Sequence, residues 1–312
     1  MKSIVVLLAT YNGGKYLRRQ LDSLFKQTNQ DFRLVVHDDG STDDTIAILE
    51  EYHDKYPDRV EIIFGNPCGG PKANFMYLLS EIEADYYFLC DQDDVWLDNK
   101  IQKSVDALRE LEENENNPTA VFTDMYVVDS ELNTLSKSFI RYIGRDPKNI
   151  AYTQILIDNP AAGTTMCFNR ALRDLAISCD SIQWENVPMH DSWLLELAAI
   201  FGKVGCIDEP LVYYRQTGAN TMGANNETVA EKVSRNIRET SEGFFAKKKS
   251  FINEARLFAR EVVRLKDIPE DKLVTLTNFI HIGTKPKLSR MRFYRENNFT
   301  RAHHNLWMRL WV

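Results

Sequence analysis

Residues 86–94 read YYFLCDQDD, so that an apolar run, Tyr86–Cys90, leads directly into Asp91, Asp93 and Asp94. A short apolar run bounded by polar residues is typical of a buried strand. An Asp-x-Asp step at the end of such a strand directs two carboxylates toward one point, where hard oxygen ligands bind Mg²⁺ or Mn²⁺. Aspartate pairs are also common in simple turns. The neighbouring sequence must therefore decide between a metal site and a turn.

Three similar units precede this segment. Short apolar runs alternate with stretches in which apolar residues recur at helical spacing. The predicted strands are 4–8, 32–36, 60–64 and 86–90, and the predicted helices are about 16–25, 42–52 and 74–82. A βαβαβαβ series folds as a doubly wound, mostly parallel α/β sheet. Ligands bind such sheets outside the carboxyl ends of the strands, which is where we expect the functional site.

The second half of the chain is less regular. We predict a helix at 98–113, a strand at 120–128, an irregular exposed insertion at 134–152, a strand at 164–168, a helix at 191–201 and closing strands at 204–207 and 211–214. From about Glu227 the pattern is only helical. We therefore predict a catalytic α/β domain over 1–222, with halves of about 1–100 and 101–222, and a helical, basic extension over 223–312.

Composition excludes several classes of protein. Of the 312 residues, 44% are hydrophobic and 27% charged, which is unlike a disordered chain, and the net charge of −7 argues against a nucleic-acid binder. The five cysteines form no C-x-x-C pair, which favours reduced thiols in the cytoplasm over disulfides or a zinc site. The apolar run 4–9 is too short for a signal peptide, and no run reaches the roughly 18–20 residues that span a bilayer. We expect a cytoplasmic protein, either soluble or held at the inner membrane surface.

Three motifs follow three of the predicted strands: ATYNG at 9–13, DDGSTD at 38–43 and DQDDVW at 91–96. In this order they resemble the family-2 glycosyltransferases of GT-A fold, over roughly residues 3–215. Together with QLDSL at 20–24 and YYRQ at 213–216, the chain more narrowly resembles bacterial rhamnosyltransferases of cell-wall polysaccharide synthesis. The resemblance implies an inverting, metal-dependent transferase that moves a sugar from a dTDP- or UDP-sugar to a saccharide. Rhamnose from dTDP-rhamnose is the preferred donor, and a UDP-hexose is the alternative.

The resemblance assigns residues to the nucleotide. Thr10 and Tyr11 would line its pocket, and Asp39 would accept the N3–H of uracil or thymine. Lys72 and Asn74 fall where relatives hold the nucleotide. Asp39 also fits a turn-forming aspartate, and Lys72 also fits an ordinary surface lysine.

The same resemblance places the cation. Asp91 would lie beside the ribose and the metal, and Asp93 would ligate Mg²⁺ or Mn²⁺ directly, whereas Asp94 fits a helix cap equally well. Many relatives carry a histidine after the closing strand, but this chain has Thr217 there. Arg215 would then supply positive charge near the diphosphate, or the metal would keep an additional water.

On the acceptor side, inverting transfer needs a base that deprotonates the attacking hydroxyl. The family places an aspartate at the start of a helix, and Asp191 matches that position, although it also fits an N-cap. His190 would have a supporting role. Gly163 and Thr164 resemble the acceptor-side loop of the family. Trp193 is a candidate platform for stacking a sugar, with core packing as the alternative.

The end of the chain, 285–312, carries seven lysines and arginines against Glu296 alone, interleaved with aromatic and aliphatic residues. A basic, aromatic segment suits the surface of an anionic membrane, where it would bring the enzyme to a lipid-linked acceptor. The alternatives are a helix packed on the catalytic domain or a homodimer contact. Nucleic acid is not an expected partner.

Two other functions remain open from the residues. A sugar-phosphate nucleotidylyltransferase also uses a parallel sheet and Mg²⁺, but it would show a Gly-rich, Arg-containing loop after the first strand. The sequence at 9–15, ATYNGGK, is not of that kind. A binding-only protein of the same fold is disfavoured by the presence of both Asp93 and Asp191.

Overall fold

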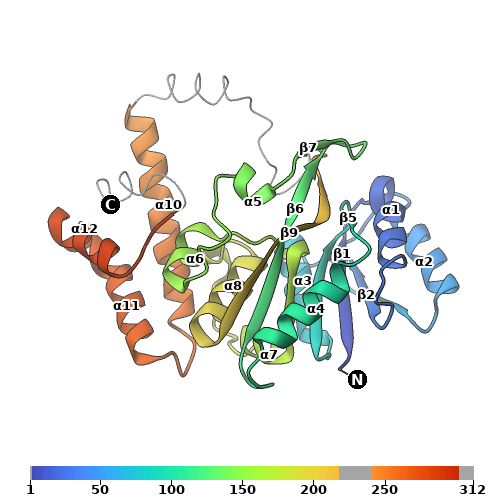
Figure 1. The fold of residues 1–312 in the computed structure, drawn as a ribbon, viewed down its shortest axis with the longest axis horizontal. Helices are drawn as coiled ribbons and strands as arrows, with labels where there is room; N and C mark the ends of the chain where they lie inside the picture. Colours follow the sequence, from blue (N-terminus) through green and yellow to red (C-terminus); the bar gives the residue numbers. More distant parts are fainter. Residues whose placement is uncertain (1, 218–240, 302–312) are drawn as a thin grey trace.

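The computed structural model of the chain describes residues 2–217 and 241–301, with only the backbone at 241–249. Its centre is a mixed sheet with the strand order β3-β2-β1-β4-β8-β6-β9-β5, and β7 pairs with β6 (Figure 1). The strands are β1 (Ile4–Thr10), β2 (Arg33–Asp38), β3 (Val60–Ile63), β4 (Tyr86–Asp91), β5 (Val95–Trp96), β6 (Thr119–Val128), β7 (Thr134–Ser136), β8 (Met166–Asn169) and β9 (Lys203–Arg215).

Helices cover both faces of this sheet and continue beyond it (Figure 1). They are α1 (Gly14–Leu24), α2 (Thr45–Lys55), α3 (Pro71–Glu81), α4 (Lys100–Leu111), α5 (Phe139–Tyr142), α6 (Tyr152–Asp158), α7 (Arg170–Ala176), α8 (His190–Phe201), α10 (Ser241–Val262), α11 (Glu270–His281) and α12 (Lys287–Glu296). Short 3₁₀ turns are η1 (Gly163–Thr165), η2 (Trp184–Asn186) and η3 (Ile282–Thr284).

The first half of the sheet is parallel. β1 pairs with β2 on one side and β4 on the other, and β2 pairs with β3. Successive side chains of β1 point to opposite faces, so Val5 and Leu7 enter the core beneath α3 and α8 while Val6 and Leu8 enter the core beneath α1 and α4. The predicted doubly wound α/β fold is confirmed, and its parallel strands end at one edge of the sheet.

β8 runs against its neighbours. It pairs antiparallel with both β4 and β6, with Phe88 opposite Cys167 and Phe122 opposite Met166. The turn η1, which precedes β8, therefore lies at the carboxyl end of β4. This reversal brings a loop from the second half of the chain to the edge where the first-half strands end.

Parts of the second half differ from the prediction. The insertion 134–152 was expected to be irregular and exposed, but it contains β7 and α5, and Phe139 and Ile140 are buried. Their backbone N–H groups donate to the buried carboxylate of Asp124, at 3.0 and 3.2 Å, which pins α5 against β6. The two predicted closing strands are one long strand, β9, with a shift of register against β6 near Asp124. The predicted boundary at 221–226 lies outside the described residues.

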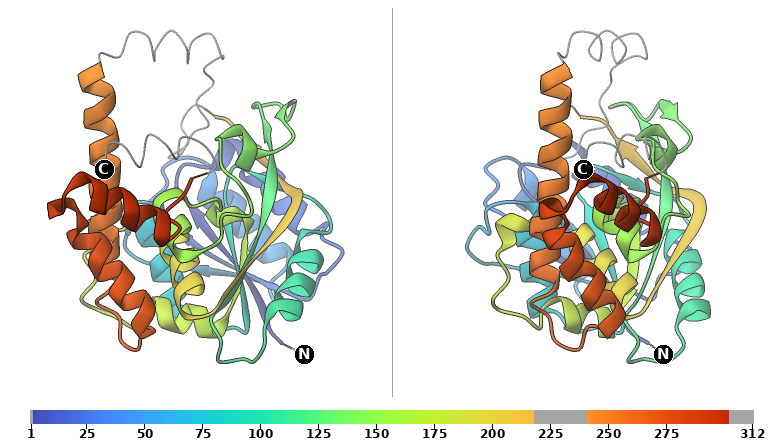
Figure 2. Two further views of the ribbon diagram at one scale, coloured as in Figure 1. Left: turned by 60° about the vertical axis from the view of Figure 1, so that its left-hand side comes forward. Right: turned by 90° about the vertical axis from the view of Figure 1, so that its left-hand side faces the viewer.

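The C-terminal helices α10, α11 and α12 pack beside α6 and α8 (Figure 2). Phe258, Phe279 and Phe299 from these segments belong to the same apolar core as Trp193 of α8. The rings of Phe279 and Phe299 are stacked, with centroids 4.6 Å apart. The described part of the extension thus shares a core with the α/β domain. None of the described helices has the length and apolar character needed to cross a membrane.

Candidate active site

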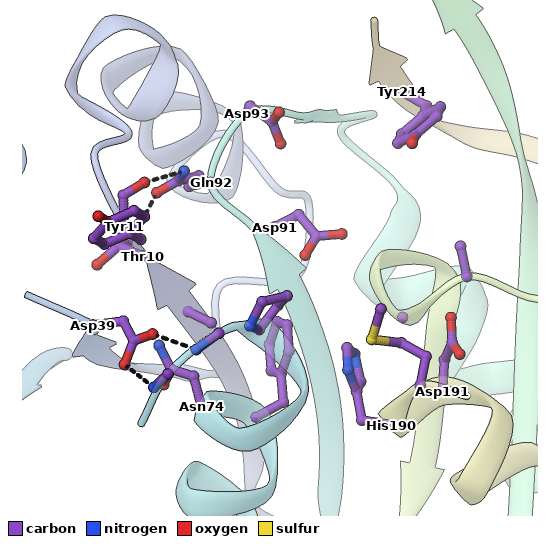
Figure 3. Close-up of a pocket in the computed structure, with 18 of the residues that line it drawn as sticks. Thr10, Tyr11, Asp39, Asn74, Asp91, Gln92, Asp93, His190, Asp191 and Tyr214 are labelled. Carbon is purple, nitrogen blue, oxygen red and sulfur yellow. Dashed lines mark hydrogen bonds between the residues drawn. The ribbon is translucent and has the colours of Figure 1, made fainter. Parts of the chain in front are cut away.

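A cavity of about 590 Å³ opens at the carboxyl ends of β1, β2 and β4, facing η1, α8 and the end of β9 (Figure 3). Nine of the residues predicted for the site line it. They are Thr10, Tyr11, Asp39, Asn74, Asp91, Asp93, Gly163, His190 and Asp191. Predicted residues from both halves of the domain therefore meet in one cavity, at the carboxyl ends of the strands where α/β sheets bind ligands.

Asp39 organises one wall of the cavity. Its carboxylate accepts backbone N–H groups from Cys68, from Gly69 at 3.1 Å and from Gly70 at 2.6 Å (Figure 3). Gly69 and Gly70 have φ values of 87° and 124°, which residues other than glycine rarely adopt. A carboxylate has about four lone-pair sites, so Asp39 retains capacity for one further donor from a ligand. The turn between β3 and α3 is thereby folded over the cavity.

Tyr11 is held as an exposed aromatic platform. Its backbone N–H donates to Gln92 Oε1 and its carbonyl accepts from Gln92 Nε2, both at 2.8 Å. Gln92 packs so closely that a Cβ at position 13 would lie 2.2 Å from Oε1, which explains the glycine there. The Tyr11 side chain is 57% exposed at the cavity, and a flat aromatic surface of this kind suits stacking on a nucleobase. Thr10 lies beneath it and donates to Asp38 at 2.7 Å.

Asp91 and Asp93 bring negative charge to the cavity. Burial and the neighbouring carboxylates of Asp93 and Asp191 raise the pKa of Asp91 to about 7. Burial also raises the pKa of Asp93, and Arg215 opposes that rise. Over 2–217 and 250–301 no three His, Cys, Asp or Glu side chains are arranged to hold a metal ion. Repelling carboxylates that share one cavity fit a divalent cation whose remaining ligands come from substrate oxygens.

Arg215 and Asp94 lie behind these aspartates. Asp94 is fully buried, accepts the backbone N–H of Arg215 at 3.3 Å and is hydrogen-bonded by Thr164. The buried Arg215 guanidinium donates to the carbonyls of Ser130 and, at 2.8 Å, Asp93. Neither Arg215 nor Thr164 lines the cavity. Arg215, which was predicted to contact the diphosphate, binds the backbone of the Asp93 loop in this structure.

Asp191 lies in the first turn of α8, where the helix dipole favours a carboxylate. The N-cap is Met189, so the alternative N-cap role does not describe Asp191. Asn159 Nδ2 and Ser192 Oγ lie 3.4 and 3.2 Å from its Oδ1. Burial raises the pKa of Asp191, while Ser192 and Arg145 lower it. A partly desolvated carboxylate with a raised pKa is a stronger base than one in water, as proton abstraction requires.

Two further predicted residues, Lys72 and Trp193, also lie outside the cavity. Lys72 Nζ donates to the carbonyls of Trp184 and, at 2.7 Å, Val187, and so ties α3 to η2. Trp193 is fully buried, donates to the carbonyl of Ala176 at 3.0 Å and packs edge-on against Trp184. Trp193 therefore follows the core-packing alternative rather than the sugar-stacking one.

The cavity also has lining residues that the sequence did not single out. They are Phe75, Gln92, Phe139, Met189 and Tyr214, among others. Gln92 and Tyr214 stand inside or beside predicted motifs, a signal that could have marked them. Phe139 carries no such signal, because its place depends on the anchoring of α5 by Asp124.

Comparisons with known proteins identify the family of this chain. The sequence profile of glycosyl transferase family 2 matches residues 5–176. The dTDP-rhamnosyl transferase RfbG of Shigella flexneri is 30% identical, over 70% of this chain and 74% of its own. An uncharacterized glycosyltransferase of Nostoc, alr2836, is 26% identical, over 74% of this chain and 70% of its own.

Solved structures show the same fold. Residues 1–349 of Staphylococcus aureus TarS, in complex with UDP, superpose with a TM-score of 0.55 at 18% identity, covering 89% of this chain and 70% of that one. The mannosyltransferase PcManGT of Pyrobaculum calidifontis, in complex with GDP-Man and Mn²⁺, gives a TM-score of 0.53 at 15% identity, covering 95% and 73%. The protein is a member of glycosyl transferase family 2, with a GT-A type fold.

Proposed function

We propose that this protein transfers rhamnose from dTDP-rhamnose, with inversion and with the help of a divalent cation, to a hydroxyl of a saccharide acceptor in cell-wall or surface polysaccharide synthesis. The observation that carries the proposal is the meeting of three features in one cavity. These are the loop held by Asp39, the carboxylates of Asp91 and Asp93, and the partly desolvated carboxylate of Asp191.

In this mechanism the residues of the chain bind and orient the nucleotide and deprotonate the acceptor hydroxyl. Tyr11 and Asp39 hold the nucleotide base, the first by stacking and the second by accepting N3–H. Asp191 takes the proton from the acceptor hydroxyl as that oxygen attacks the anomeric carbon. A single displacement of this kind inverts the anomeric configuration. Asn159 and Ser192 keep the Asp191 carboxylate in place.

Asp91 and Asp93 are the residues that would hold Mg²⁺ or Mn²⁺. Their mutual repulsion, seen in the raised pKa of Asp91, is relieved by a divalent cation. When bound, the cation neutralises negative charge that develops on the departing diphosphate. The complex of PcManGT with GDP-Man and Mn²⁺ supports a cation in a protein of this fold.

The choice of donor rests on a relative. RfbG of Shigella flexneri is described as a dTDP-rhamnosyl transferase, which favours dTDP-rhamnose. The alternative, a UDP-hexose, is favoured by the complexes of TarS with UDP and UDP-GlcNAc. Uracil and thymine share the N3–H that Asp39 would accept, so this contact serves both bases. Family membership disfavours both the nucleotidylyltransferase and the binding-only alternative.

The acceptor would be lipid-linked and presented at the inner face of the cell membrane. The described part of the basic tail supports this location, because Lys285, Lys287, Arg292 and Arg295 are exposed around Leu288, which is 80% exposed. Such a surface attracts anionic headgroups. α12 packs on the protein through the buried Tyr294, whereas these exposed residues remain available for membrane contact. A homodimer formed through the same exposed basic residues is the competing arrangement.

The test is turnover of dTDP-rhamnose, UDP-glucose and UDP-GlcNAc by the purified chain, with Mn²⁺, with Mg²⁺ and with EDTA. Asp93→Ala should lose cation-dependent turnover, and Asp191→Asn should still bind the donor but lose transfer. Asp98→Asn, an exposed aspartate outside the cavity, serves as the matched control and should retain activity. Wild-type rates in Asp191→Asn would mean that another residue is the base, and failure of all three donors would contradict the proposed function.

A further inference from the structure

His190 is a buried histidine that faces the cavity with unused hydrogen-bonding groups. It is the first residue of α8, its side chain is 4% exposed, and it lines the cavity beside Asp191. Neither Nδ1 nor Nε2 has a hydrogen-bond partner within the described part of the chain. Buried polar groups in proteins are nearly always paired. Two unpaired ring nitrogens at the wall of a binding cavity therefore point to a ligand.

Apolar packing fixes the ring in this position. The imidazole packs against Phe75 of α3, with centroids 4.4 Å apart and planes at 38°. On another side it lies so close to η1 that a Cβ at Gly163 would be 2.7 Å from Nε2. In Figure 3 the ring lies at the cavity between Asp191 on one side and Asn74 on the other. The ring is thus oriented in advance, without a polar contact that a ligand would have to break.

The charge state limits what His190 can bind. Burial, with a smaller contribution from Lys72, lowers its pKa to about 3, so the ring is neutral at physiological pH. A neutral imidazole offers one N–H donor and one acceptor nitrogen. It is a poor proton acceptor, which leaves the role of base to Asp191. A ligand group that both donates and accepts matches it best, and the sugar hydroxyl is such a group.

We propose that His190 hydrogen-bonds a hydroxyl of the donor sugar and so helps to select which sugar is transferred; this rests on the proposed function. Two neighbours of His190, Phe75 and Asp191, favour the donor side over the acceptor side. Phe75, against which the ring packs, directly follows Asn74, which was predicted to hold the nucleotide. Adjacent helix residues point in different directions, so that Asp191 turns to the acceptor while His190 turns to the sugar held between α8 and the Asp91 strand end.

The test compares nucleotides with nucleotide sugars by isothermal titration calorimetry. Wild type, His190→Phe and His190→Gln are titrated, in the presence of Mg²⁺, with dTDP and dTDP-rhamnose and then with UDP and UDP-glucose. Phenylalanine keeps the packing on Phe75 but removes both polar groups, whereas glutamine keeps a donor and an acceptor. Thermal melting verifies that each variant is folded.

We expect His190→Phe to bind dTDP within about twofold of wild type and to bind the nucleotide sugar roughly tenfold more weakly, the usual size of one lost hydrogen bond to a buried partner. His190→Gln should recover part of that loss. Equal losses for dTDP and dTDP-rhamnose would show a merely structural role and overturn the inference, as would unchanged binding of both nucleotide sugars. If the wild type itself binds neither nucleotide sugar, the proposed function fails. If the wild type binds them and the His190 variants bind them equally well, only the inference about His190 fails.

Discussion

Replacing Asp91 with asparagine should stabilise the folded protein while it abolishes activity. Asp91 stands beside the carboxylates of Asp93 and Asp191 in a half-buried position, and its pKa is raised from 3.8 to about 7 by burial and by these neighbours. The folded state therefore holds the ionised Asp91 at a cost in free energy. Asparagine has nearly the same shape and no charge, so the substitution removes this cost without creating a cavity.

The size of the effect follows from the pKa. One pKa unit corresponds to about 1.4 kcal/mol, so a rise to about 7 sets an upper limit near 4 kcal/mol. Because Asp91 is only half-buried and lines a cavity open to solvent, screening reduces this to about 1–2 kcal/mol. The folded pKa lies above the unfolded one, so the wild type loses this stability as the pH rises. The advantage of Asp91→Asn is then absent below about pH 4, grows between pH 4 and 7, and is complete above pH 7.

The assay is thermal unfolding of both proteins from pH 4 to 8.5, with EDTA and with Mn²⁺. In EDTA at pH 8 the variant should melt roughly 2–6 °C higher than wild type. Mn²⁺ should raise the melting temperature of the wild type more than that of the variant and narrow the gap, because only the wild type retains both proposed cation ligands, Asp91 and Asp93. Asp208→Asn is a control of opposite sign, since Arg141 lowers the pKa of Asp208. A variant that is less stable than wild type in EDTA at pH 8 would refute this reasoning.

Two predictions concern the C-terminal helices. Phe299→Ala should destabilise the protein by about 3–5 kcal/mol, because the ring is fully buried on Phe279, whereas Leu288→Ala at an exposed position should change stability by no more than about 0.5 kcal/mol. Thermal melting measures both, and an unaffected main transition in Phe299→Ala would mean that the extension unfolds separately. Reversing three exposed charges, Lys285→Glu, Lys287→Glu and Arg295→Glu, should weaken flotation with phosphatidylglycerol vesicles by about a hundredfold or more at low salt. Equal binding by the charge-reversed protein would contradict the membrane proposal.

The cavity residues of the first half of the chain could be predicted because their signals are local. Thr10, Asp39 and Asp91 each follow an apolar run of predictable length, and the parallel order of β1, β2 and β4 brings such strand ends together. Asp191 could be placed because it opens a helix, where a carboxylate is well accommodated. Both inferences use only periodicity, chain order and a family resemblance carried by contiguous motifs.

The rest depended on contacts that a single sequence does not contain. Nothing in the sequence around Lys72 indicates that its ammonium group will find the carbonyls of Trp184 and Val187, more than a hundred residues away. Arg215 was expected to face the diphosphate, yet the register of β9 against β6 places it behind the loop of Asp93. The insertion 134–152 lacked periodicity because its order comes from one buried carboxylate, Asp124. Long-range pairing decides all three cases.

The reversed direction of β8 means that two walls of the cavity are built from independent parts of the chain. The residues proposed for the donor side follow β1, β2 and β4, which are hydrogen-bonded to one another or to β3 as parallel strands. An insertion or deletion in one of these strands would therefore disturb the register of its neighbours. The turn η1 enters β8 from the opposite direction and follows the segment 129–162 that contains α5 and α6. That segment can lengthen, shorten or be exchanged without altering the register of β1, β2 or β4. Under the proposed function, a change in this segment would alter the acceptor side and leave the nucleotide side intact.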